Sequence, residues 1–131
     1  MTERLQLDIL TPSRKILSTT CEEVYMPGSE GEFGVLREHS PLVATLSIGV
    51  VRIKDGGNVE QVAVRGGFVQ VRENRIALLA DEAIKASEVD RLGLEKESVE
   101  VEAKLLDAAV GVDERTKLYG VRDWIRAKQL L

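Results

Sequence analysis

Over the first two thirds of the chain, apolar and polar residues alternate with a period of two. In the first such run Leu5, Leu7 and Ile9 point one way while Gln6 and Asp8 point the other. Successive side chains of a strand face opposite sides, so the alternation predicts short strands with one buried face. The alternating apolar positions are Leu5, Leu7, Ile9, Val24, Met26, Val51, Ile53, Val62, Val64, Val69, Val71, Ile76, Leu78 and Ala80.

Turn-forming residues separate these runs. Thr11-Pro12-Ser13 ends the first run, and Pro27-Gly28 with Gly31 opens a loop. Residues 55–58 (Asp-Gly-Gly-Asn) and Glu73-Asn74 are typical of tight hairpin turns. The gaps are too short for helical crossovers, which argues against a parallel sheet. The pattern therefore predicts an antiparallel β-sandwich.

The period changes near Ala86 and predicts a helix. Ser87 followed by Asp90 resembles a capping box, with Ser87 as the N-cap. Apolar residues then recur at steps of three and four, with Lys96 at the one remaining position, which predicts a narrow seam buried against a partner. The seam is Val89, Leu92, Val99, Ala103, Leu106 and Val110, and the opposite face carries Glu88, Glu95 and Glu102.

A second helix is predicted after a short connection. Gly111 is expected to end the first helix and Asp113 to cap the second. Two helices joined by a short loop form an antiparallel hairpin. Gly93 and Gly120 weaken the helices by about 1 kcal/mol each, so the hairpin must pack on something to be stable. Its second helix has apolar positions at Leu118, Val121, Trp124, Ile125 and Leu131.

The chain is thus expected to be mainly β with an α appendage. Residues 1–86 form the predicted sandwich and residues 87–131 the helical hairpin. Aromatic residues make up 4% of the chain, so the core must be aliphatic. Gly66-Gly67 within the strand-rich part indicates a bulge or a close approach of two backbones.

Composition argues against catalysis, metals and cofactors. Cys21 and His39 are the only cysteine and the only histidine, which excludes an intrachain disulfide, a cysteine-based zinc site and any site that needs two histidines. The net charge of −4, without a basic block, argues against nucleic-acid binding. No run approaches the roughly 18 apolar residues of a membrane span, and the N-terminus lacks the apolar region of a secretory signal.

The polar segment 27–42 is the densest candidate for chemistry. Its glycines do not form a phosphate-binding loop, since no Gly-Lys-Ser/Thr ending and no helix follow, and Glu30 and Glu32 would repel phosphate. It is interpreted as a surface loop with a solvated or partner-facing acidic tip, and His39 as a structural residue. Arg122 and Arg126 share a helix face, and either solvated charge or docking onto an acidic partner fits them.

Several segments, taken in order, resemble the epsilon subunit of F-type ATP synthases of bacterial or chloroplast type. The resemblance covers essentially the whole chain and is most specific in the segment that begins at Gly28. The matching segments are Leu5–Pro12, Gly28–Leu36, His39–Leu42, Gly49–Ile53, Gly66–Phe68 and Leu79–Ala83.

This resemblance implies a non-catalytic subunit at the foot of the central stalk. It would bind the gamma subunit, touch the c-ring and couple the two, with Glu30, Gly31, Glu32 and His39 as candidate c-ring contacts. Association with the membrane would come only through the complex, on the cytoplasmic face of a bacterial plasma membrane or the stromal side of a thylakoid. The absence of a targeting segment favours a bacterial or plastid-encoded subunit.

The resemblance also implies that an extended hairpin inhibits ATP hydrolysis. Arg122, Arg126 and Lys128 are the candidates for docking onto an acidic segment of the beta subunit. Some family members bind ATP on the folded hairpin through a motif of which only Asp90 remains here. Gly93 and Leu94 stand at its Arg and Ala positions, so ATP binding is predicted to be weak or absent.

Three alternatives compete with this assignment. A stand-alone β-sandwich binding module would need an aromatic-lined pocket, which the low aromatic content argues against. A small enzyme is disfavoured by the lone histidine and cysteine. A helical-hairpin adaptor would need a longer seam than this chain provides.

Overall fold

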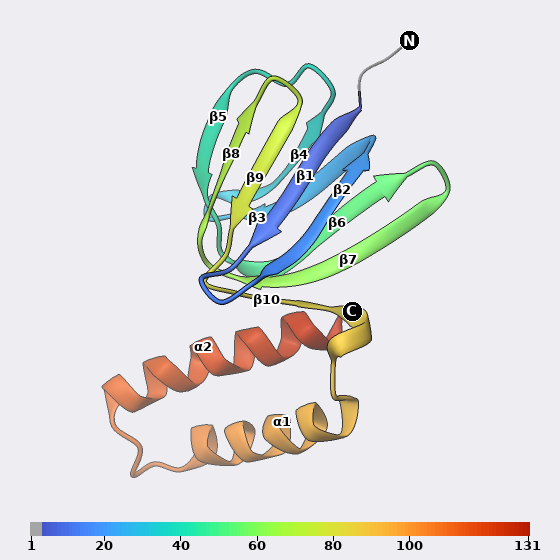
Figure 1. Cartoon of the computed structure of the whole chain (residues 1–131). Helices are drawn as coiled ribbons and strands as arrows, with labels where there is room; N and C mark the ends of the chain where they lie inside the picture. Colours follow the sequence, from blue (N-terminus) through green and yellow to red (C-terminus); the bar gives the residue numbers. More distant parts are fainter. Residues whose placement is uncertain (1–3) are drawn as a thin grey trace.

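The computed structural model describes residues 4–131. Within that range, ten β-strands form two five-stranded sheets, and two helices follow them (Figure 1). The sheets stack as a sandwich, and the helices run antiparallel to each other beside it. The predicted architecture, an N-terminal β-sandwich followed by a two-helix hairpin, is confirmed.

The two sheets take strands from all parts of the sandwich. Sheet A has the order β2-β1-β9-β8-β5 and consists of β1 (Leu5–Leu10), β2 (Lys15–Cys21), β5 (Leu42–Thr45), β8 (Phe68–Arg72) and β9 (Arg75–Leu79). Sheet B has the order β10-β7-β6-β3-β4 and consists of β3 (Glu23–Gly28), β4 (Gly31–Leu36), β6 (Ile48–Asp55), β7 (Asn58–Arg65) and β10 (Glu82–Lys85).

The core between the sheets is aliphatic. Every alternating apolar position predicted from the sequence is buried, as in β1, where Leu5, Leu7 and Ile9 are inaccessible to solvent. Ile16, Cys21, Val35 and Leu46 complete the core cluster. Burial of each Leu, Ile, Val or Met side chain contributes about 1.5–3 kcal/mol, which is how a chain poor in aromatics stabilises a sandwich.

One strand pairing departs from the antiparallel pattern. β1 pairs in parallel with β9, with Leu7 opposite Ile76 and Ile9 opposite Leu78. The sequence argument considered only connections between neighbouring runs. β1 and β9 are instead connected through strands of both sheets, so no helical crossover is needed.

The two predicted hairpin turns are confirmed. Asp55 pairs with Asn58 across Gly56, whose φ is 62°. Glu73 and Asn74 have φ values of 51° and 61°, as a turn with two left-handed central residues requires.

The prediction that residues 27–42 form a surface loop is wrong for their middle part. β3 continues to Gly28 and β4 begins at Gly31, so only two residues separate the strands, and Pro27 pairs with Glu32. Gly34 pairs with Tyr25, and a Cβ atom at Gly34 would lie 2.7 Å from the Tyr25 ring. At this position glycine serves close strand packing rather than loop flexibility.

Gly67 is a site of close backbone approach, as its sequence context predicts. Its φ is 106°, and a Cβ atom there would lie 2.0 Å from the Leu79 carbonyl oxygen. Its own carbonyl oxygen accepts a hydrogen bond from Leu46 N at 2.9 Å. Only glycine fits both the backbone angle and the space.

The predicted helix caps are wrong. Ser87 lies in a short 3-10 turn, η1 (Ala86–Glu88), and Asp90 is the N-cap of α1 (Arg91–Leu106). The intervening Val89 is extended, which separates the two turns. α1 ends at Leu106 rather than at Gly111, and Gly111 instead precedes α2 (Val112–Gln129) as its N-cap, where Asp113 had been expected.

α2 lies between the sandwich and α1 (Figure 1). On one side its Trp124 and Ala127 pack with Ala63 of β7, so Ala63 is buried although it points away from the sandwich core. On the other side Ile125 packs with Leu94 and Val101 of α1. The apolar positions predicted for α2 are therefore buried or half-buried.

The predicted seam is wrong within α1, although Val89, which precedes the helix, does pack against the cluster formed by α1 and α2. Leu92, Val99 and Leu106 are exposed, and the stripe that faces α2 contains Leu94 and Val101 instead. α1 carries two apolar stripes, and the periodic spacing of the first gave no indication that α2 would occupy the second.

Candidate functional site

The acidic turn between β3 and β4 is exposed at one end of the sandwich. Ser29 and Glu30 form it, Gly31 begins β4, and Glu32 follows in the same strand. Glu32 Oε1 lies 2.6 Å from Arg52 Nη2, so this carboxylate is neutralised by a partner on β6. The neighbouring Ser29 N donates to the Thr45 carbonyl oxygen at 3.0 Å, which ties the turn to the end of β5.

His39 lies beyond the other end of β4. Its Nδ1 is 2.7 Å from the Ser40 carbonyl oxygen, and its backbone N donates to the Leu36 carbonyl oxygen at 3.2 Å. The preceding residue, Glu38, donates from its backbone N to Asn74 Oδ1 in the β8–β9 turn. The candidate c-ring contacts are therefore in two places, with Glu30, Gly31 and Glu32 at one end of β4 and His39 past the other.

The outer face of sheet A carries an apolar patch that the sequence analysis missed. Val43, Phe68 and Leu79 are 70%, 47% and 39% exposed. Phe68 lies opposite both Thr45 and Leu79, and Val43 is on the same edge strand as Thr45. We call these three residues the sheet A patch. The sequence does contain a signal for this patch. Each of the three is an apolar residue at an outward-facing position, in alternation with the inward-facing positions of its strand.

The three basic candidates on α2 all make contacts within the hairpin. The Arg122 guanidinium lies 4.8 Å from the centre of the Tyr119 ring, and Lys128 Nζ lies 5.2 Å from that of Trp124. Arg126 Nη2 lies 4.0 Å from Glu102 Oε1 on α1. These are cation–π contacts and a surface ion pair, worth about 1 kcal/mol or less each. The basic side chains are therefore held weakly and can exchange partners.

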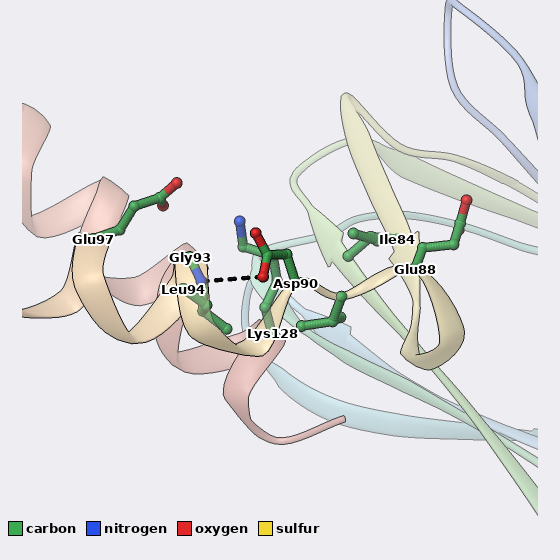
Figure 2. Close-up of a pocket in the computed structure, with 8 residues that line it drawn as sticks. Ile84, Glu88, Asp90, Gly93, Leu94, Glu97 and Lys128 are labelled. Atoms are coloured by element: carbon green, nitrogen blue, oxygen red, sulfur yellow. Dashed lines mark hydrogen bonds between the residues drawn. The ribbon is translucent and has the colours of Figure 1, made fainter.

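Asp90 lies in a pocket between the end of the sandwich and α1 (Figure 2). Its Oδ1 accepts a hydrogen bond from Gly93 N at 3.1 Å, which is the N-cap bond of α1. Glu88 and Glu97 also line the pocket, and Lys128 is its one basic residue. The lining thus has more acidic than basic groups, which disfavours a polyphosphate.

Two contacts absent from the sequence analysis hold the hairpin in place. Arg14 in the β1–β2 turn pairs with Glu88 at 2.8 Å, and Glu88 also accepts from Lys85 N at 3.1 Å. The bond to Arg14, followed by the bond to Lys85, lowers the pKa of Glu88 below its ordinary 4.5. At the other end of the hairpin, Arg115 of α2 donates to the carbonyl oxygens of Leu105 and Asp107 at 2.6 and 3.1 Å.

Cys21 belongs to the core rather than to a reactive site. Its side chain is inaccessible to solvent, and burial is the main cause that raises the pKa of its thiol to about 11. Among residues 4–131, no group of three or more His, Cys, Asp or Glu side chains is arranged to hold a metal ion. Neither helix in this range has the length and apolar character needed to cross a bilayer.

The sandwich matches a known protein family. The family described as "ATP synthase, Delta/Epsilon chain, beta-sandwich domain" matches residues 4–86, which is more than half of the chain. The chain belongs to this family. Its epsilon-type relatives include the "ATP synthase epsilon chain" of Desulforamulus reducens, 43% identical over 69% of this chain and 68% of the relative.

The similarity to ATP synthase epsilon chains extends into the hairpin. The epsilon chain of Microcystis aeruginosa is 34% identical over 92% of this chain and 87% of its own length. The fold also resembles a chain in the Euglena gracilis mitochondrial ATP synthase, with a TM-score of 0.83, 23% identity, and coverage of 97% of this chain and 80% of that one. As an ATP synthase epsilon-family member, this chain is a non-catalytic subunit of the central stalk and part of the membrane-associated complex.

Proposed function

We propose that this chain joins the gamma subunit to the c-ring and that its hairpin restrains ATP hydrolysis. The observation that carries the first part is the sheet A patch. Val43, Phe68 and Leu79 lie on the sandwich face that the hairpin leaves uncovered, since α2 packs on β6 and β7 of the other sheet. Exposed apolar patches with polar surroundings mark protein–protein interfaces. We assign this patch to gamma.

The acidic β3–β4 turn is the proposed contact with the c-ring. Glu30 is exposed at the tip of a two-residue turn, and the pairing of β3 with β4 holds that tip rigidly. A rigid tip transmits force better than a long loop, which suits a torque-bearing contact. His39 remains a candidate, and its position beyond the far end of β4 means that it would meet a different part of a partner.

The hairpin is the proposed regulatory element. α2 reaches the sandwich mainly through Trp124 and Ala127, and α1 packs mainly on α2. A small interface of this kind can open at modest free-energy cost, as a two-state switch requires. In the open state Arg122, Arg126 and Lys128 would leave their weak contacts in the hairpin and bind an acidic segment of the beta subunit.

The proposed location follows from the complex. The chain would be peripheral and would lie on the same side of the membrane as the catalytic head. That side is the cytoplasmic face of a bacterial plasma membrane or the stromal side of a thylakoid. It would need no cofactor, and the acidic pocket at Asp90 supports weak or absent ATP binding.

The test compares ATP hydrolysis by the reconstituted catalytic head with the full chain and with a chain truncated after Ala86. We expect the truncated chain to bind gamma and hydrolysis to rise. Unchanged hydrolysis with retained binding would remove the regulatory role and leave the coupling role intact.

Gamma binding is tested separately with the double variant Val43→Gln/Phe68→Gln. The matched control is Val59→Gln, because Val59 is an exposed valine of sheet B, away from the patch. We expect the double variant to bind gamma at least about tenfold more weakly and the control to bind normally. Equal binding by all three proteins would show that gamma uses another surface.

A further inference from the structure

The outward side of α1 is apolar and uncovered in the closed hairpin. Leu92, Val99 and Leu106 are 82%, 67% and 86% exposed, which is high for large aliphatic side chains. We call these three residues the outer stripe. The inner stripe of the same helix, with Leu94 and Val101, is already packed against Ile125 of α2. α1 therefore has one apolar face in use and one face free.

The spacing of the outer stripe suits a partner helix. Its members are seven residues apart, and Lys96 and Ala103 fall between them at the alternate positions of a heptad. Side chains in this arrangement interlock with those of a second helix lying along the first. Leu92 and Val99 already line a shallow groove together with Glu95, Lys96 and Glu100. The alternation of a large apolar residue with a smaller or flexible one leaves room for the side chains of the second helix.

The charges beside the stripe select the kind of helix. Glu95 lies along one flank and Glu100 along the other, by the helical period of 3.6 residues. Both carboxylates border the groove, and Lys96 is the one base there. A second copy of this chain would bring the same acidic flanks into contact, and like charges in that position repel. A helix with basic flanks would bring opposite charges instead.

We propose that the outer stripe is a docking surface for an amphipathic helix of another chain whose apolar stripe is flanked by Lys or Arg. Docking requires no opening of the hairpin, because the inner stripe stays on α2. The helix would therefore bind the closed form. This inference goes beyond the proposed function and does not depend on whether the open hairpin inhibits hydrolysis.

The experiment uses the full chain and two fluorescein-labelled synthetic peptides of about three heptads. Both peptides have leucine at the a and d positions. One has lysine at e and g, and the other has glutamate there. Binding is measured by fluorescence anisotropy. Trp124, the only tryptophan, reports whether the hairpin stays closed, because its ring is buried against the sandwich.

We expect the lysine peptide to bind at least about tenfold more tightly than the glutamate peptide, with unchanged Trp124 emission. The variant Leu92→Gln/Val99→Gln/Leu106→Gln should lose this binding and keep its melting temperature, since the three side chains are exposed. The control variant Val112→Gln/Leu130→Gln removes two other exposed apolar residues of the hairpin and should bind normally.

Four results of the peptide experiment would overturn the proposal. They are failure of the lysine peptide to bind, equal binding of both peptides, full binding by the triple variant, and a red shift of Trp124 emission on binding, which would mean that the peptide opens the hairpin. Self-association of the full chain that disappears in the triple variant would assign the stripe to a second copy and would overturn the proposal as well.

Discussion

Arg14 Nη1 lies 2.8 Å from Glu88 Oε2, and this ion pair joins the β1–β2 turn to the linker between the sandwich and α1. Because the linker is the point at which a hairpin would swing away, the pair favours the closed arrangement. Glu88 also accepts a hydrogen bond from Lys85 N, so its carboxylate has a second reason to stay ionised.

The interactions of the Glu88 carboxylate should make the stability of the fold depend on pH. Its pKa in the folded protein is lowered from the ordinary 4.5, first by Arg14 and then by Lys85. A lowered pKa stabilises the fold above pH 4.5, and that stabilisation is lost as the pH falls through the folded-state value. Glu88→Gln should therefore lower the urea midpoint at about pH 7 and lower it less at about pH 3. Glu95→Gln on α1 is the control, and an equal loss at both pH values would contradict the assignment.

Cys21 should be unreactive in the native protein. Burial, followed by the nearby charge of Asp55, raises the pKa of its thiol from 9.0 to about 11. The thiolate is the reactive form, so iodoacetamide at about pH 8 should label Cys21 only after unfolding in urea. A raised pKa also means that stability is constant below pH 9.0 and falls as the pH rises toward about 11. Rapid labelling of the native chain would contradict this.

Gly67→Ala should be strongly destabilising. The new methyl group would lie 2.0 Å from the Leu79 carbonyl oxygen, at a φ of 106° that alanine rarely adopts. We expect a loss of about 3 kcal/mol or more in the free energy of unfolding, measured by urea denaturation. Gly57→Ala is the matched control, because nothing lies within 4 Å of its added carbon. Its effect should stay within about 1 kcal/mol.

Arg115→Gln should loosen the turn of the hairpin. The arginine donates to the carbonyl oxygens of Leu105 and Asp107 at the end of α1, and the Asp107 oxygen also accepts from Val110 N at 3.2 Å. Losing both bonds should cost about 1–2 kcal/mol locally and speed amide exchange at residues 104–110 by about tenfold. Lys117→Gln on the same helix is the control. Unchanged exchange in the Arg115 variant would show that the bonds add no stability.

The sequence predicted the sandwich well because its information is local. Alternation of side chains identifies the inward face of a strand without knowledge of its neighbours, and Val62 and Val64 are buried as expected. Ala63 between them is also buried, which no strand pattern implies, since α2 covers it from a distant part of the chain. The parallel pairing of β1 with β9 likewise joins strands far apart in the sequence, so no local pattern predicts it.

The hairpin was predicted less well, for a related reason. Leu92 and Leu94 begin two apolar stripes of similar quality on one helix, and only the position of α2 decides which stripe is buried. Asp90 and Ser87 are both good N-cap residues. The hydrogen bond from Lys85 N to Glu88 closes a separate 3-10 turn, and Ser87 lies inside that turn.

The sequence identified residues that could contact a partner, but it did not show where they lie in the fold. Glu30 and His39 are near in sequence, and a loop between them would have kept them together. Because β4 is a strand, it carries them to opposite ends of the sandwich. The sheet A patch went unnoticed because Phe68 and Leu79 are far apart in the chain and meet only through strand pairing.

The parallel pairing of β1 with β9 also limits the order in which the strands of sheet A can pair during synthesis on the ribosome. β1 emerges first and can pair at once only with β2, while its other edge waits for the ninth of the ten strands. Sheet A therefore closes only after most of sheet B has been synthesised, and β9 must enter between two strands already present. A nascent chain halted before Arg75 has an open edge at the middle of its first sheet, where another unfinished chain could add a strand.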